Sequence, residues 1–219
     1  MHSSDMYPGQ VPRSADVRVR LALVEQAAAM LAAGEPVTLR AVASAVGAST
    51  QVVYTHFGGM PGLLLAIREE GFDRLAVRLE GLRPSADPVA DIMTLASSYT
   101  ANAMANPHLY LQMFTKRPGT GPPVSAGSTF AVLVAATARA RAAGRFARRT
   151  EPERAALQLW APTHGMTMLV LTGAIDLAAL AENLPPMCVS AFVGHGDRPA
   201  TARRSVAAGW RPPSASVSG

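Results

Sequence analysis

The chain has 219 residues, a formal net charge of +5 and a single cysteine. This length accommodates one ordinary domain or a small and a medium domain that each bury a core, and the lone cysteine excludes an intramolecular disulfide. Aromatic residues make up 5% of the chain and no run of alternating β-branched residues is sustained, so we expect an all-α fold.

The first segment is polar and contains two prolines, which predicts a disordered arm over residues 1–14. From residue 15 onwards apolar residues recur with helical spacing, beginning with Val17, Leu21 and Val24. Gly34 and Pro36 end this pattern. We therefore predict an amphipathic helix that packs against the elements that follow it.

Residues 38–57 have the pattern of two short helices joined by a tight turn. Leu39, Val42, Ala43 and Val46 lie on one helical face, with Thr38 in the N-cap position. Gly47 then suits a left-handed turn, and Ser49 suits the cap of a second helix. This arrangement predicts a helix-turn-helix within a DNA-binding domain over residues 15–59.

If the second helix buries Val53 and Phe57, it turns Thr50, Gln51 and Tyr54 outward. Gln51 suits the N6/N7 edge of adenine and Thr50 suits a thymine methyl, so we expect these two to read bases. Tyr54, His56 and the Thr38 hydroxyl are expected to hold phosphates, whereas Ser49 contacts DNA or serves only as a cap.

A long apolar helix is predicted from Pro61 to about Leu82, where it would link the DNA-binding unit rigidly to the rest of the chain. Two more helices are expected at 89–105 and 108–115. Residues 116–128 are rich in Gly, Pro and Ser and are expected to form a loop, either a gate to a cavity or simply disordered.

Helices are expected to resume at 128–146 and 151–172. The next apolar segment, 174–192, contains a break predicted near Pro185-Pro186, and a short helix follows at 198–208. Residues 60–210 would form one helical domain, and residues 211–219 a disordered tail.

The segment TLRAVASAVGASTQVVYTHF, some twenty residues after a longer amphipathic helix, resembles the DNA-binding domain of the TetR/AcrR family of transcriptional regulators. The resemblance covers about residues 17–67 and implies that Val52 also faces the major groove. The sequence around Trp160, His164 and Gly165 resembles the C-terminal ligand domain of the subgroup named for those three residues, WHG. The family implies a homodimer, with an interface formed by residues 151–172 and 174–193.

One position departs from the family pattern. Met60 stands where the family usually has a lysine that contacts a DNA phosphate. Residues 1–60 also balance four arginines against four acidic residues, while five arginines gather between Arg139 and Arg149. That arginine run is interpreted as a solvated helix face and its C-terminal end, where cations suit the helix dipole. The support for DNA binding therefore comes from the helix-turn-helix pattern and not from the charge of this segment.

Apolar and aromatic residues of the C-terminal part are expected to line an effector pocket, although each of them also fits an ordinary core. The expected pocket residues are Met93, Tyr99, Tyr110, Phe114, Trp160, His164 and Met168.

No catalytic motif is apparent, so we expect no enzyme, no cofactor and no metal site. His195 and Asp197 are too few to hold a metal, and Cys188 fits a core residue better than a redox switch. The N-terminus has no apolar leader and no window approaches the length and apolarity of a membrane span, so we expect a cytoplasmic protein without a membrane partner.

The sequence therefore predicts a homodimeric, ligand-responsive transcriptional regulator. As a repressor, it would bind a palindromic double-stranded DNA operator and be released by a small apolar or aromatic effector. The alternative is a helical small-molecule-binding protein that has lost specific DNA binding, as the neutral N-terminal unit and Met60 suggest.

Overall fold

The computed structural model describes residues 13–115 and 123–214, and within them the protein is all-α, as predicted. The predicted arm falls mainly on residues 1–12, outside the described residues, and part of the predicted loop and tail falls on 116–122 and 215–219. The helices in chain order are α1 (Arg13–Ala32), α2 (Leu39–Ala45), α3 (Thr50–Phe57), α4 (Met60–Glu80), α5 (Pro88–Ala105), α6 (Pro107–Met113), α7 (Val124–Ala142), α8 (Pro152–Leu171), α9 (Leu177–Gly194) and α10 (Pro199–Gly209).

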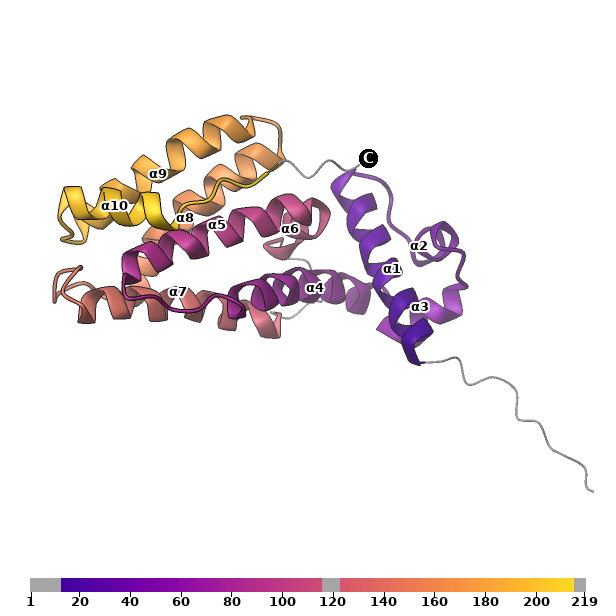
Figure 1. The fold of residues 1–219 in the computed structure, drawn as a ribbon. Coiled ribbons are helices and arrows are strands. Elements are labelled where there is room, and N and C mark those ends of the chain that lie inside the picture. The colour runs from indigo at the N-terminus through magenta and orange to yellow at the C-terminus, as the bar shows by residue number, and fades with distance from the viewer. Residues whose placement is uncertain (1–12, 116–122, 215–219) are drawn as a thin grey trace, which may run out of the picture.

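Helices α1, α2 and α3 form a unit at one end of an elongated molecule (Figure 1). Their apolar faces meet around Leu23, Val42 and Val53, which are fully buried. Leu63 and Ile67 from the start of α4 complete this apolar core, which we call the N-terminal cluster. Met60 also packs against it.

Helix α4 continues from the N-terminal unit into the C-terminal helices (Figure 1). It contains 21 residues and is therefore about 31 Å long. Its first half contributes to the N-terminal cluster, whereas Phe72, Leu75 and Leu79 in its second half belong to a separate C-terminal core. A single long helix thus contributes to both cores, as the sequence predicted.

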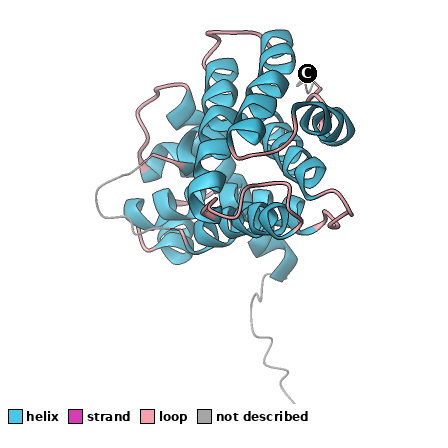
Figure 2. Ribbon diagram, turned by 90° about the vertical axis from the view of Figure 1, so that its left-hand side faces the viewer, coloured by secondary structure: helices cyan, strands magenta, loops and turns pink. Residues whose placement is uncertain are grey.

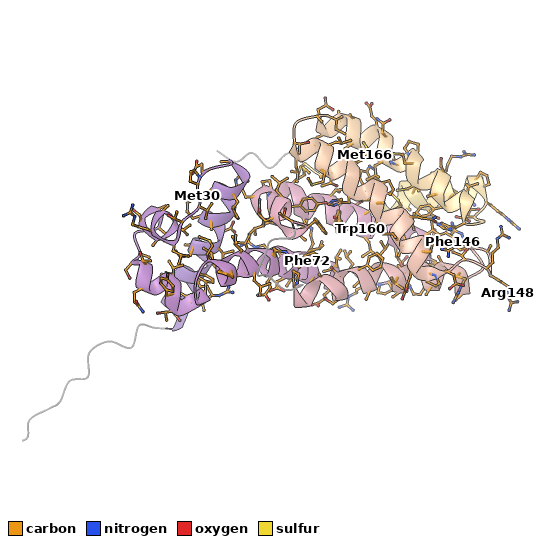
Figure 3. All side chains as sticks on the ribbon, turned by 180° about the vertical axis from the view of Figure 1, so that it is seen from behind. Met30, Phe72, Phe146, Arg148, Trp160 and Met166 are labelled. Carbon is orange, nitrogen blue, oxygen red and sulfur yellow. The ribbon has the colours of Figure 1, made fainter. Side chains whose placement is uncertain are left out.

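Helix α5 contacts α4, α6, α7, α8 and α10, whereas α9 packs against α8 and α10. Figure 2 shows the helices from a second direction. Figure 3 locates Phe72, Phe146 and Trp160 in this half of the molecule and Met30 in the N-terminal half. Gly209 of α10 lies directly against α5, because a Cβ atom there would come within 2.1 Å of the Ala90 carbonyl oxygen.

Several helix bounds differ from the sequence prediction: α1 begins at Arg13, within the predicted arm, and α7 ends at Ala142 rather than near residue 146. Helix α7 begins at Val124, several residues earlier than expected. Helix α9 runs through Pro185 and Pro186 without the predicted break. A proline ring removes one backbone donor, yet its fixed φ remains compatible with a helix, so the helix continues through both positions.

The arginine run at 139–149 is not simply a solvated helix face. Arg145 binds Asp87 and Asp197, at 2.8 and 2.6 Å, and Arg139 forms an ion pair with Asp91. Asp197, which together with His195 offers too few ligands for a metal, has a side chain that is 2% exposed and is paired with this arginine. These ion pairs join α5 to α7 and to the turn after α9.

Helix α9 alone among the described helices is long and apolar enough to span a membrane, by length and composition only. The sequence reading had found no such window. In this stretch 22% of the residues are buried, others such as Val189 pack partly against the C-terminal core, and Met187 is 41% exposed.

Candidate DNA interface and ligand cavity

Both short helices of the helix-turn-helix begin at the side-chain caps that the sequence predicted. The Thr38 hydroxyl accepts a hydrogen bond from the Ala41 N–H at 3.1 Å, and the Ser49 hydroxyl accepts one from the Val52 N–H at 3.4 Å. Gly47 has a φ of 69°, the left-handed conformation that a turn of this kind requires. These contacts set the direction in which α3 leaves the turn.

The outward face of α3 presents Gln51, which is exposed, and Tyr54, which is 50% exposed. Thr50 is partly exposed at the N-terminus of the helix. Val52, expected to face the groove by family resemblance, is half-buried and packs against the N-terminal cluster. The exposed polar residues of α3 are therefore Gln51, Tyr54 and Thr55, and the Thr55 hydroxyl donates to the Gln51 carbonyl.

The phosphate contact predicted for His56 stays a prediction, and in the structure this side chain has a partner within the protein. Its side chain is 11% exposed, and its Nε2 atom lies 3.2 Å from an Asp16 carboxylate oxygen on α1. The neighbouring Phe57 ring carries the Arg20 guanidinium 5.5 Å from its centroid. His56 thus has a partner within the protein, and these contacts tie α3 to α1.

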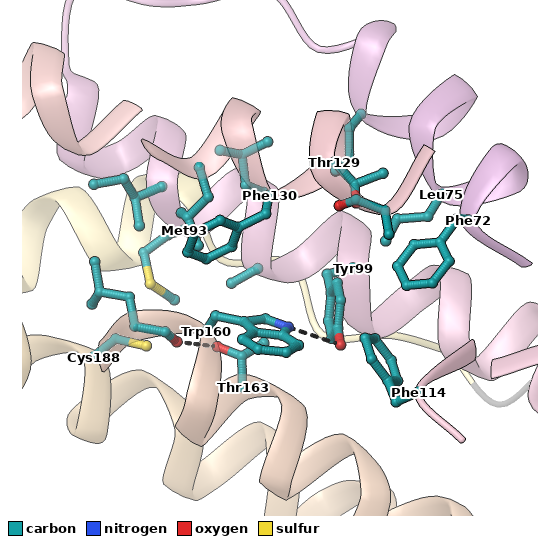
Figure 4. A pocket seen from close by; sticks show the side chains of 17 residues that line it. Phe72, Leu75, Met93, Tyr99, Phe114, Thr129, Phe130, Trp160, Thr163 and Cys188 are labelled. Atoms are coloured by element: carbon teal, nitrogen blue, oxygen red, sulfur yellow. Dashed lines mark hydrogen bonds between the residues drawn. The ribbon is translucent and has the colours of Figure 1, made fainter. Parts of the chain in front are cut away.

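A cavity of about 280 Å³ lies between α4, α5, α7 and α8 in the C-terminal half (Figure 4). Four of the expected pocket residues line it: Met93, Tyr99, Phe114 and Trp160. Tyr110, His164 and Met168 do not. Met168 packs against the outside of the C-terminal core, and the other two lie behind the Tyr99 hydroxyl.

Most of the cavity wall was not predicted from the sequence. The wall residues missed were Phe72, Leu75, Leu79, Ile92, Leu95, Ala96, Ala126, Thr129, Phe130, Leu133, Leu159, Thr163 and Cys188. Their sequence signal, apolar residues at helical spacing, is the same signal that an ordinary core gives.

At one end of the cavity a hydrogen-bonded cluster joins α5, α6 and α8. The Trp160 indole N–H donates to the Tyr99 hydroxyl at 3.0 Å, as Figure 4 shows, and the Tyr110 hydroxyl donates to the same oxygen at 2.7 Å. The Tyr99 hydroxyl lies 3.0 Å from His164 Nδ1. We call these four residues the tyrosine cluster.

The tyrosine cluster is uncharged at neutral pH. Burial raises the pKa of Tyr99 to about 12, and it raises the pKa of Tyr110 as well. Burial also lowers the pKa of His164, which favours the neutral imidazole. Because Tyr110 already donates to Tyr99, the Tyr99 proton is available to His164 Nδ1, which leaves the imidazole proton on Nε2.

The lowered pKa of His164 predicts that acid destabilises the fold. The unfolded chain takes up a proton on this residue near its ordinary pKa of 6.5, before the folded chain does. The free energy of unfolding should therefore have its full value above pH 6.5. It should decrease as the pH drops below 6.5, by at most about 1.4 kcal/mol per pH unit for one histidine. Urea unfolding of the wild type and His164→Gln at about pH 7.5 and about pH 5.5 measures this.

The wild type should lose more stability on acidification than the variant does. His195, whose pKa is also lowered by burial, remains in both proteins and sets the shared part of the pH dependence. Equal losses in the two proteins would contradict the assignment to His164.

Helix α6 contacts both cores. Leu109 is buried in the N-terminal cluster, whereas Tyr110 and Met113 are buried in the C-terminal core. The Met113 carbonyl accepts a hydrogen bond from the Arg68 side chain on α4 at 3.3 Å. A Cβ atom on Gly71 would meet the Met113 side chain at 2.5 Å, so α4 and α6 touch closely there. The tyrosine cluster is thus connected to the DNA-binding unit by one short helix.

The comparisons with known proteins identify the C-terminal half. Residues 92–185 match the sequence model of the family described as Tetracyclin repressor-like, C-terminal domain. No curated protein matches the chain significantly. The assignment to the subgroup named for Trp, His and Gly stays a prediction.

Solved structures share the whole fold. A Rhodococcus sp. RHA1 protein of unknown function superposes with a TM-score of 0.68 at 25% identity, over 82% of this chain and 96% of that one. The fatty acid degradation regulator FadR from Bacillus halodurans gives 0.65 at 14% identity, over 81% and 98%. A TetR family transcription regulator from Marinobacter aquaeolei VT8 gives 0.63 at 17% identity, over 85% and 100%. Residues 92–185 thus match the Tetracyclin repressor-like C-terminal domain, and the chain has the fold of the TetR-family regulators on which it superposes.

Proposed function

We propose that this chain is a ligand-responsive transcriptional regulator, acting as a repressor that binds a palindromic operator as a homodimer. The observation that carries the proposal is the pairing of two features within one rigid framework. One is a capped helix-turn-helix that exposes Gln51 and Tyr54. The other is an apolar cavity lined by α4 and by Phe114, the residue directly after α6, and both of these helices also contribute to the N-terminal cluster.

Exposed apolar residues on α8 and α9 support the homodimer. Leu157 and Leu169 on α8 are 51% and 43% exposed, and Met187 on α9 is 41% exposed. Helices α8 and α9 pack against each other, and together they leave an apolar surface that a second copy would cover. A twofold dimer places two α3 helices on two half-sites, which implies a palindromic operator.

Effector release would operate through α6. A small apolar or aromatic molecule in the cavity contacts Phe114, directly after α6, and Tyr99, which holds Tyr110 of α6. A change in the position of α6 would shift Leu109 in the N-terminal cluster and with it the spacing of the two α3 helices. To shift occupancy strongly, the effector must bind the released state more tightly by several kcal/mol.

Selection of bound fragments from genomic DNA tests the DNA-binding half of the proposal. We expect a pseudo-palindromic site with half-sites about one or more helical turns apart. Affinity for that site should fall linearly with the logarithm of salt concentration. Recovery of no common sequence, even at low salt, would contradict specific DNA binding.

That negative result is what the alternative function predicts, namely a helical small-molecule-binding protein without specific DNA binding. The observation in its favour is Met60, which packs against the N-terminal cluster. Because its side chain is an uncharged thioether, this position supplies no cation to a phosphate.

Replacing Gln51 by alanine should remove base selectivity at one position of each half-site. Gln51 is exposed on α3 and reads a base edge through its amide, so its loss is expected to cost about 1–3 kcal/mol of discrimination at that position. The readout is the ratio of affinities for the selected operator and its single-base variants.

The matched control is Gln158→Ala, which removes an exposed amide from α8. It should leave the selectivity ratio unchanged even if the affinity of the dimer changes. Tyr54→Phe is expected to weaken binding to all sequences alike. An unchanged base preference in Gln51→Ala would remove Gln51 from the reading surface.

A further inference from the structure

The cavity wall carries no charged side chain among the residues that the structure describes. Twelve of its seventeen lining residues are hydrocarbon or thioether side chains. The five with a polar atom are Tyr99, Thr129, Trp160, Thr163 and Cys188. The hydrogen-bond donors and acceptors that these five side chains leave unpaired therefore determine which molecules the cavity binds.

The strong hydrogen-bond donors among these groups are already bound within the protein. The Trp160 N–H donates to Tyr99, and the Tyr99 O–H faces His164 Nδ1. The Thr129 hydroxyl donates to the Ala126 carbonyl and the Thr163 hydroxyl to the Leu159 carbonyl, both at 2.9 Å. Burial raises the pKa of the Cys188 thiol to about 12, so it stays a thiol, which is only a weak donor.

Acceptors, by contrast, remain. Each threonine oxygen keeps a lone pair after its proton is donated, because a hydroxyl has one donor and two acceptor sites. A carboxylate placed in the cavity would thus find neither a cation nor a free strong donor on the described wall. A buried charge without partners is strongly disfavoured. An uncharged hydrocarbon surface carries no such penalty, and a ligand hydroxyl could still donate to a threonine oxygen.

We infer that the cavity is a site for uncharged, mainly hydrocarbon molecules that carry at most two hydrogen-bond donors, one for each threonine oxygen, and that it rejects carboxylates of the same shape. This inference rests on the proposed function, in which the cavity binds the effector, and it specifies the chemical class of that effector. With a volume of about 280 Å³ the cavity suits a small ligand.

Four probes of one shape test this inference: naphthalene, 2-naphthol, 2-acetylnaphthalene and 2-naphthoate. Calorimetric titration of the full chain at about pH 7.5 should rank 2-naphthol first, and 2-naphthoate should bind at least about 100-fold more weakly. If 2-naphthoate binds within about threefold of 2-naphthol, the inference is overturned and the proposed function remains. If none of the four binds, both the inference and the effector part of the proposed function are overturned, while DNA binding is unaffected.

A pair of variants tests directly whether the hydrogen-bond donors of the wall are occupied. Tyr99→Phe removes the acceptor of the Trp160 N–H and leaves Tyr110 free to donate to His164 Nδ1, which lies 2.8 Å away. The freed indole donor should raise the affinity for 2-acetylnaphthalene relative to naphthalene by about tenfold. The ratio should return to the wild-type value in the double variant Tyr99→Phe/Trp160→Phe, which lacks that donor.

Both substitutions keep an aromatic ring, and a thermal unfolding scan verifies that each variant is folded before it is titrated. The claim is that the wall does not bind acceptor ligands because its donors are already occupied. It would be overturned if folded Tyr99→Phe kept the wild-type ratio of the affinities for 2-acetylnaphthalene and naphthalene.

Discussion

Replacing Gly62 by alanine is expected to abolish specific operator binding. Gly62 lies in the first turn of α4, directly after the helix-turn-helix, and a Cβ atom there would come within 1.8 Å of the Phe57 carbonyl oxygen. Because this neighbour is backbone, the clash can be relieved only by moving α3 relative to α4. The expected cost is about 1–3 kcal/mol of stability, with a loss of DNA binding that exceeds it.

The control for this substitution is Gly127→Ala. Gly127 is also helical, and a Cβ atom there meets nothing within 4 Å. It should be neutral or stabilising by up to about 1 kcal/mol, with operator affinity unchanged. Equal operator affinities for the two glycine variants would contradict the close approach of α3 and α4. Electrophoretic or fluorescence binding assays and urea unfolding give the two readouts.

Loss of the Asp197 carboxylate is expected to destabilise the C-terminal half by about 3–5 kcal/mol. Asp197 is almost fully buried and receives two hydrogen bonds from Arg145, at 2.9 and 2.6 Å. The hydrogen bond to Asp197 raises the pKa of Arg145. A guanidinium also stays charged at neutral pH without that partner. Asp197→Ala therefore leaves a cation that keeps only Asp87 as an ionic partner.

The matched control is Asp73→Ala, which removes a carboxylate from an exposed position on α4. Its effect should stay within about 0.5 kcal/mol. Urea unfolding of both variants distinguishes a buried ionic network from a solvated arginine face. Equal, small effects would mean that the Arg145 cluster contributes nothing to stability.

The helix-turn-helix could be predicted from the sequence because its information is local. The caps at Thr38 and Ser49, the left-handed Gly47 and the helical spacing of Val42 and Val53 all act within a few residues of each other. The same reasoning placed His56 on the DNA, whereas the structure pairs it with Asp16. That contact comes from the packing of α1 against α3, which a pattern within α3 does not contain.

The cavity shows the limit of sequence reasoning more clearly. An apolar residue that lines a void and one that fills a core have the same spacing, so Phe72 and Leu133 gave no distinct signal. The family-like Trp160 and His164 drew attention to α8, but only Trp160 reaches the cavity wall. His164 instead holds the tyrosine hydroxyls from behind.

The arginines at 139–149 were hard to interpret for a related reason. A run without acidic residues resembles a solvated face, but Arg145 finds its partners 58 and 52 residues away, at Asp87 and Asp197. Burial opposes ionisation of Asp87, yet hydrogen bonds from Ser205 and the Ala90 N–H, together with Arg145, outweigh it and lower its pKa. Long-range charge pairing of this kind appears only once the helices are packed.

The proposed control of DNA binding depends on the close coupling between the cavity and α6. Tyr110 and Met113 of α6 lie in the C-terminal core, which surrounds the cavity. Leu109 of the same helix lies in the N-terminal cluster. Arg74 of α4 adds a polar tie, because it binds both Glu25 of α1, at 2.5 Å, and the Asn106 side chain at the start of α6, at 2.7 Å. A displacement of α6 is thus transmitted to α1 as well as to α4.

The most direct measurement is the dissociation constant of the full chain for its selected operator, with and without saturating 2-naphthol, while calorimetry verifies that the cavity is occupied. We expect the occupied protein to bind the operator at least about tenfold more weakly, with binding to unrelated DNA little changed. An operator affinity that is the same for the empty and the occupied protein would contradict control of DNA binding by the cavity.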